Sequence, residues 1–244
     1  MKNLTYLRFE ILRTLRNRRF LIFSLIFPLV LFFAIASPNK NIVVLGIPFP
    51  LYYMTGMAAW GSMTAMLSSG ARIAAERQIG WTRQMKITPL STWSYFTAKV
   101  LSGYMMALFA IIGLGIAGST LGVSLSVVQW LTMLALLLVG LIPFAVIGIL
   151  LGHLMKVDSL GPALGGVTSL FALLGGSFGP IFTSGVMLKI VKDIPSYWLV
   201  QASRSVLSPS GWPPPQAWIV IAIWSVVMAR VAARVYQRDS QRVS

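Results

Sequence analysis

Long stretches without any charged residue constrain the fold of this chain more than any other feature. The longest, from Val100 to Gly152, covers 53 residues and contains no Asp, Glu, Lys or Arg. A helix crosses the bilayer core with about 20 mostly apolar residues, so this run predicts two spans joined by a turn between Gly115 and Ser124. Charged residues make up 10% of the chain, against about 25% in soluble domains. The pattern predicts a helical membrane protein and excludes a soluble chain, while the high hydrophobicity excludes a disordered one.

Six apolar segments predict an all-α integral membrane protein with six transmembrane helices in a single domain, residues 1–244. A lipid-facing β-barrel would instead show alternating segments of about ten residues. The sixth segment is the least apolar, because it contains Arg230 and Arg234. Their side chains must extend to the interface if the segment is to span the membrane. Trp218 and Tyr236 lie about 27 Å apart at 1.5 Å per helical residue, which favours a full span. The predicted spans are 20–37, 51–71, 100–118, 128–152, 159–182 and 217–236.

The distribution of basic residues predicts the orientation. The chain carries 20 Lys and Arg against 5 Asp and Glu, a formal net charge of +15. Because the basic residues flank apolar runs, anionic lipid is favoured over nucleic acid as their partner. With six spans, most of them lie on the side of the two termini, which the positive-inside rule assigns to the cytoplasm. We expect a multi-pass protein of the cell membrane; the basic residues on the outer side are Lys40, Lys189, Lys192 and Arg204.

Residues 1–19 form a basic segment ahead of the first apolar run. Their pattern predicts an amphipathic helix on the membrane surface, although Arg8 intrudes on its apolar arc. The helix serves either as a mechanical connector or as a plain topogenic anchor. The apolar arc consists of Leu4, Leu7, Ile11, Leu12 and Leu15.

Residues 72–99 form a long charged loop on the predicted cytoplasmic side. Arg72 and Glu76 lie one turn apart and can form an ion pair, and Gly80 permits a chain reversal. Apolar side chains occur among the charges, a combination that favours a protein-binding surface. The alternative is a loop that lies on the lipid headgroups. The apolar members are Ile79, Trp81, Met85 and Ile87.

Two further features concern the second half of the chain. The segment 179–215 is rich in Pro and aromatic residues and predicts either a re-entrant or interfacial cap or a simple extracellular loop.

Glycines at four-residue spacing in spans four and five allow close helix packing. The packing is either within the chain or towards a second copy or a substrate path. These glycines are Gly148 and Gly152, then Gly161, Gly165, Gly175 and Gly179.

One motif carries a family resemblance. The chain reads Glu76-Arg77-x-x-Gly80, then Thr88-Pro89-Leu90-Ser91, with Lys99 before the third span. This pattern, together with the basic N-terminus, six spans and Pro-containing outer loop, resembles type-2 ATP-binding-cassette (ABC) permeases. Trp81 is a departure, since family members more often carry a small hydroxylated residue after the glycine.

The resemblance implies the membrane subunit of a bacterial-type multidrug or lipid exporter. Such permeases form homodimers or heterodimers and pair with two copies of an ATP-binding subunit. The connector helix and the loop 72–99 dock on those subunits. The resemblance places Pro180, Pro195 and Trp198 in an outer re-entrant segment. It places Arg8, Arg72, Glu76, Arg77, Gly80, Trp81 and Arg83 in the region that couples to the ATPase.

The chain carries no motif for catalysis of its own. It has no G-x-x-x-x-G-K-[ST] loop, so we expect ATP and Mg²⁺ on a partner chain. It has one histidine, His153, and no cysteine, and its acidic residues form no acid–base pair or metal cluster in the sequence. We therefore expect a transport subunit that is not itself an enzyme and has no metal site.

The spans also offer a candidate substrate path. No acidic residue is predicted at bilayer depth, which disfavours an ion-coupled carrier. Aromatic and Met side chains in spans two and five could line a path for an amphipathic drug or lipid, although core packing is the alternative. Export of polysaccharide or another solute, an intramembrane lipid-modifying enzyme and an assembly factor are alternative functions. The candidate path residues are Met57, Trp60, Thr64, Phe171, Leu174 and Phe178.

Overall fold

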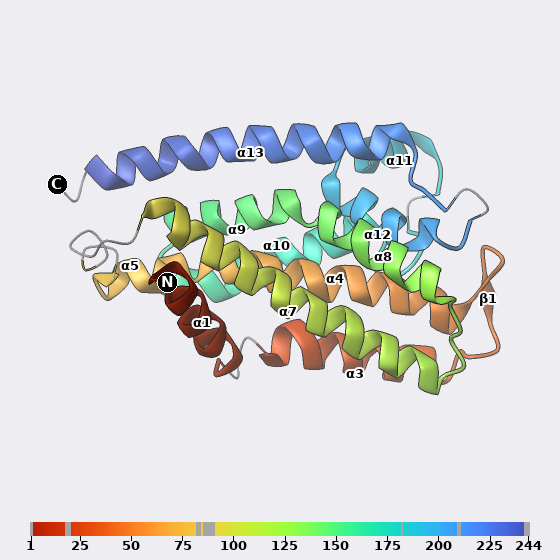
Figure 1. The fold of residues 1–244 in the computed structure, drawn as a ribbon. Coiled ribbons are helices and arrows are strands. Elements are labelled where there is room, and N and C mark those ends of the chain that lie inside the picture. The colour runs from red at the N-terminus through yellow and green to blue at the C-terminus, as the bar shows by residue number, and fades with distance from the viewer. Residues whose placement is uncertain are drawn as a thin grey trace.

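Helices form every long element of the computed structural model, which describes residues 2–17, 21–81, 84, 91–181, 183–208 and 211–241 (Figure 1). Two strands of two residues each, β1 and β2, pair in a short antiparallel hairpin. The elements are α1 (Lys2–Leu15), η1 (Ile22–Ile26, a π-helix), α3 (Phe27–Ala36), β1 (Val43–Val44), β2 (Ile47–Pro48), α4 (Phe49–Ala71), α5 (Ile73–Gln78), α7 (Thr92–Thr120), α8 (Val127–Gly140), α9 (Ile142–Leu154), α10 (Val157–Gly175), α11 (Gly185–Lys192), α12 (Pro195–Ser205) and α13 (Pro215–Gln241).

Four helical segments of the described residues are long and apolar enough to cross a membrane. The prediction of an all-α membrane protein is therefore confirmed. The predicted span 20–37 corresponds to a shorter apolar helix, Ser24–Ala36. The predicted span 51–71 corresponds to α4, in which Thr, Ser, Gly and Tyr reduce the hydropathy. Six crossings thus remain a prediction; the four segments are Thr92–Thr120, Val127–Leu154, Val157–Gly175 and Pro215–Arg238.

Helix α4 forms the centre of the bundle and is buried along almost its whole length. It packs against α3, α7, α9, α10 and α12. Its contact with α9 is backbone to backbone, since a Cβ atom on Gly70 would lie 2.4 Å from the nitrogen of Ile149. Gly148 and Gly152 meet the backbone of α4 in the same way. This pair therefore serves packing within the chain.

The glycines of α10 behave differently. An added Cβ on Gly161 or Gly165 would meet nothing within 4 Å, whereas one on Gly175 would lie 2.8 Å from the carbonyl oxygen of Ser196 in α12. Close packing within the chain explains Gly175 but not Gly161 or Gly165. The same sequence spacing thus has two structural meanings.

Several helix boundaries differ from the predicted ones. Helix α7 begins at Thr92 because Ser91 caps it, with its Oγ accepting a hydrogen bond of 3.2 Å from the Ser94 nitrogen. The last part of the predicted loop 72–99 is therefore helical. Helix α10 ends at Gly175, seven residues before the predicted end of span five, because Gly176 adopts a left-handed conformation with φ +74°. Left-handed glycine is a common helix terminator.

The two ends of the molecule contain different structures (Figure 1). One end holds α1, α5 and the C-terminal end of α13, where the Tyr236 hydroxyl lies 3.3 Å from that of Thr92. The other end holds the β1–β2 hairpin, α11 and α12. Helix α12 lies inside the bundle, packed against α4, α8 and α10. We call these the α1 end and the α12 end.

Candidate functional site

Three fully buried charged residues meet at the α1 end. The Lys99 ammonium lies 2.7 Å from a Glu10 carboxylate oxygen and also donates to Glu76. Lys99 is 0% exposed, and both glutamates are buried. Because the residues come from α7, α1 and α5, the ion pairs join three helices. We call this group, with the neighbours described next, the ionic cluster.

Four further side chains complete the ionic cluster. Arg13 donates a 2.6 Å hydrogen bond to Glu76, and the Tyr95 hydroxyl donates to the same carboxylate. Arg72 lies 3.5 Å from Glu10 and donates to the Thr14 hydroxyl. A buried charge is costly unless it is paired and hydrogen-bonded. The cluster therefore satisfies its charges only when α1, α5 and α7 are docked together.

Electrostatics at the edge of the cluster follow from burial. Burial lowers the pKa of the Arg72 guanidinium, and the neighbouring Glu10 carboxylate acts in the opposite direction. Burial raises the pKa of the Tyr6 phenol, and the charges of Glu10 and Glu76 raise it further. Arginine stays protonated in proteins, so Arg72 contributes a permanent positive charge.

The structure places some predicted coupling residues in this cluster. Arg72 and Glu76 belong to it, but the predicted pairing between them is absent from the ion pairs of the described residues. Arg77 instead contacts α9, donating to the carbonyl oxygens of Gly152, at 3.4 Å, and His153. A cation at a helix C-terminus is stabilised by the unpaired carbonyls there.

Other predicted coupling residues lie away from the cluster. Arg8 is exposed on α1. Gly80 has φ +72° and open space around it, as a chain reversal requires, and Trp81 after it is half-buried. Arg83 lies outside the described residues.

Sequence reasoning missed several members of the ionic cluster. It placed Lys99 in the loop before the third span and assigned no partner to Glu10. The structure shows their relation, because Glu10 and Glu76 share the Lys99 ammonium. The face of α1 that is buried is centred on Glu10 and Thr14 rather than on the apolar arc. A single acid in the otherwise basic segment 1–19 was the signal that could have marked it.

The candidate path residues fall into two groups. Trp60 of α4 and Phe178 form an edge-to-face pair with ring centroids 5.1 Å apart, and Phe27 of α3 lies 5.7 Å from the same indole. Met57 and Thr64 are buried on α4. Phe171 instead packs on Phe144 of α9, at 5.4 Å. The structure thus brings Trp60 and Phe178 together and directs Phe171 to another contact.

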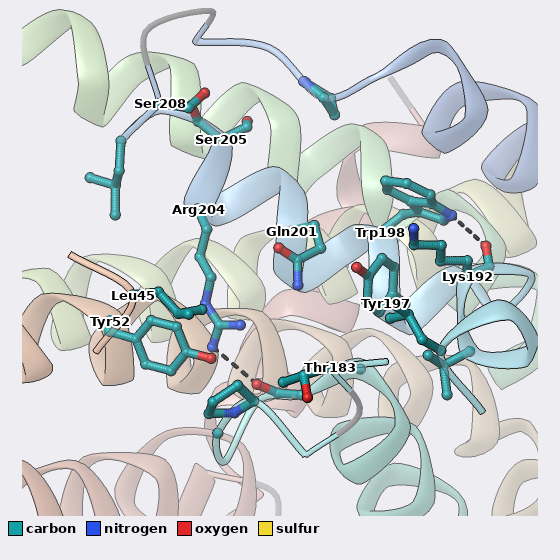
Figure 2. A pocket seen from close by; sticks show the side chains of 18 of the residues that line it. Leu45, Tyr52, Thr183, Lys192, Tyr197, Trp198, Gln201, Arg204, Ser205 and Ser208 are labelled. Carbon is teal, nitrogen blue, oxygen red and sulfur yellow. Dashed lines mark hydrogen bonds between the residues drawn. The ribbon is translucent and has the colours of Figure 1, made fainter. Parts of the chain in front are cut away.

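A cavity of about 870 Å³ opens at the α12 end. Its walls come from the β1–β2 hairpin, α4, α11, α12 and the segment after α10 (Figure 2). Leu174, Pro180 and Trp198 line it, so it contains one candidate path residue and two predicted outer-segment residues. Pro195 is buried in the first turn of α12. We call this space the outer cavity.

A buried cation lies on the wall of the outer cavity. Arg204 of α12 is 8% exposed, and its guanidinium carbon lies 3.8 Å from the ring centroid of Tyr52. Its Nη2 donates a 3.0 Å hydrogen bond to the Gly176 carbonyl oxygen (Figure 2). The described residues contain no cluster of His, Asp or Glu that could hold a metal ion.

Comparisons with known proteins place these features in a family. Residues 49–234 match the model of a family described as ABC-2 family transporter protein. The chain is also 26% identical over 195 residues to a protein of Bacillus subtilis (strain 168) named "Putative transport permease YvfS", an alignment covering 77% of this chain and 78% of that protein. The matched segment contains α4, α5, α7 to α12, most of α13 and most of the residues that line the outer cavity. The chain therefore belongs to the ABC-2 family of transporter proteins and is a type-2 ABC permease.

Proposed function

We propose that this chain is the membrane subunit of an ATP-driven exporter in the cell membrane. ATP and Mg²⁺ would bind to a separate subunit, present in two copies, and a second permease chain, identical or related, would complete the complex. The proposed substrate is an amphipathic drug-like or lipid-like molecule, moved out of the cytoplasm or the inner leaflet. The membership in a family of transporter proteins supports the permease role.

The observation that carries this proposal is the two-sided character of α5 and the turn after it. Glu76 on its inner side is bound to Lys99 and Arg13 in the ionic cluster. Ile79, directly after α5, is 65% exposed. A partner that presses on Ile79 would therefore move a segment whose ion pairs reach α1 and α7. This arrangement fits transmission of force from an ATPase into the bundle.

The proposal is tested by co-purification of this chain with a co-expressed candidate ATP-binding subunit. We expect a stoichiometric complex whose ATPase activity responds to transported compounds. The variant Ile79→Asp places a charge on the proposed docking surface and should reduce recovery of the partner about tenfold, the effect of roughly 1.4 kcal/mol of binding free energy.

Val43→Asp is the matched control, because Val43 is 63% exposed but lies in β1 at the α12 end. It should leave recovery unchanged. Vigorous transport by the permease purified without any nucleotide-hydrolysing companion would contradict the proposal. Equal loss of the partner in both variants would contradict the docking site.

The topology belongs to the same proposal. Six spans would place both termini in the cytoplasm, with α11 and α12 forming a re-entrant outer segment in a single permease domain. The location of α1 and the C-terminal end of α13 at the same end of the molecule supports this arrangement (Figure 1). Accessibility labels on the two termini should report the same face of the membrane; opposite faces would refute it.

The substrate path is proposed to include Trp60 and Phe178. Their edge-to-face contact at 5.1 Å supports a role together, and core packing is the competing explanation. If Trp60→Ala and Phe178→Ala leave export and substrate-stimulated ATPase activity unchanged, the path lies elsewhere. Stimulation by polysaccharide alone would favour the alternative substrate class.

A further inference from the structure

The outer cavity has an unbalanced charge. Two cationic residues, Lys192 of α11 and Arg204 of α12, are among the described residues that line it, and no Asp or Glu is. Neutral donors add to this wall, since Thr183 and Gln201 also line the cavity (Figure 2). The cavity therefore has positive charge and hydrogen-bond donors, and the described part of its wall supplies no carboxylate.

Arg204 is buried without the partners that such a group needs. A guanidinium offers five N–H donors, and the structure gives one of its nitrogens a carbonyl acceptor, Gly176. Its Nε is buried and has no hydrogen-bond partner among the described residues. The Tyr52 ring covers one face of the cation, a favourable contact that supplies no acceptor for Nε.

The position of Arg204 is fixed rather than loose. Gly56 lies so close that an added Cβ would stand 3.2 Å from Nη2 of Arg204 and 2.2 Å from the Ser177 carbonyl oxygen. The side chain is thus held between α4 and the segment after α10. A rigid cation on a cavity wall is arranged in advance for an anion, which lowers the entropic cost of binding.

Most of the remaining wall is apolar. Leucine, isoleucine, valine and tryptophan side chains surround the charged part, and a volume of about 870 Å³ is within the range of about 300–1,000 Å³ typical of small-molecule sites. A ligand that matches both parts needs one negative group and an apolar body. The apolar lining residues include Leu45, Ile47, Leu174, Ile181, Leu188, Val191 and Trp212.

We propose that the outer cavity binds an anionic amphiphile, with its phosphate or carboxylate on the Arg204 guanidinium and its apolar body against the surrounding wall. A bidentate pair with the guanidinium is the strong form of this contact. As a substrate or exit site the inference rests on the proposed export function; as a binding site it does not. The ligand is either a free amphiphile or the headgroup of an anionic lipid.

The test uses the full chain in phosphatidylcholine nanodiscs without any ATPase subunit. The probes are octyl phosphate and octyl trimethylammonium, which share one chain length and differ in charge, with empty nanodiscs as the blank. Binding is followed by tryptophan fluorescence, because Trp198 and Trp212 line the cavity. We expect saturable binding of octyl phosphate and none of the cation at the same concentration. Equal response to both probes would overturn the proposal, whatever the variants do.

The variant Arg204→Met should weaken octyl phosphate binding by about tenfold or more, the range expected for a charged hydrogen bond. Lys192→Gln should weaken it less, because Lys192 is partly exposed. Lys189→Gln is the matched control, since Lys189 is exposed on the same helix and does not line the cavity. An unchanged affinity in a folded Arg204→Met protein would refute the site.

A second arm identifies the source of the anion. Replacing part of the phosphatidylcholine by phosphatidylglycerol should raise the octyl phosphate concentration needed for half-saturation if a lipid headgroup occupies Arg204. No change assigns the site to free amphiphiles.

Failure to recover an ATPase partner would refute the proposed function while this charge preference stands. Recovery of the partner without a charge preference would refute only the site.

Discussion

The ionic cluster and the outer cavity each contain a buried cation, but the two cations have different partners. At the α1 end, Lys99 contacts two carboxylates, Glu10 and Glu76, and is completely buried. At the α12 end, Arg204 is almost as deeply buried but meets an aromatic ring and one carbonyl. A satisfied charge holds helices together, whereas an unsatisfied one has free capacity for a ligand. The comparison indicates a mechanical joint at one end and a binding site at the other.

Disrupting the joint should have the largest effect on stability. Glu76→Gln removes the negative charge shared by Lys99 and Arg13 and leaves the buried Lys99 ammonium with one of its two carboxylates. Breaking a buried ion pair costs about 3 kcal/mol or more, so the unfolding transition of the purified protein should shift by that free energy. The readout is chemical unfolding in detergent, followed by circular dichroism.

Two controls accompany this variant. Asp158→Asn removes an exposed carboxylate and should change stability little. Combining Glu76→Gln with Lys99→Met removes both charges and should recover part of the loss. A Glu76→Gln protein as stable as the Asp158→Asn protein would mean that the ionic cluster does not stabilise the contact between α1, α5 and α7.

A smaller effect should follow from one hydrogen bond of the cluster. Tyr95→Phe removes the hydroxyl that donates to the Glu76 carboxylate, and hydrogen bonds to charged groups contribute about 1.5–3 kcal/mol. Tyr104→Phe on the same helix removes a 3.1 Å bond to the neutral Leu138 carbonyl, which should cost about 1 kcal/mol. The same unfolding measurement compares the two, and a larger loss for Tyr104→Phe would reverse the comparison.

The smallest effect on stability is expected at the other end. Arg204→Met removes a buried cation that lacks an acidic partner among the described residues, and an apolar replacement of similar length should change the unfolding free energy by about 1 kcal/mol or less. The same variant should abolish the charge preference of the outer cavity. Destabilisation comparable to that of Glu76→Gln would make Arg204 a structural residue as well.

Sequence reasoning found the candidate sites unevenly. It marked Arg72, Glu76, Pro180 and Trp198 through the family resemblance. It could not show that Lys99 pairs with Glu10, because the two residues are 89 apart in the sequence and meet only where α1 docks on α7. Arg204 was counted as an outer basic residue, since nothing in its neighbours along the chain indicates the Tyr52 ring beneath it.

The sequence by itself determined the class of the protein, because uncharged runs longer than a bilayer requires leave few folds other than a helical membrane bundle. It also indicated the family, through short motifs that depend on local order along the chain. Only the tertiary structure decided which charges are satisfied and which are not. Pairing depends on distances between helices that are far apart in sequence, and these distances follow from packing, such as the glycine contacts between α4 and α9.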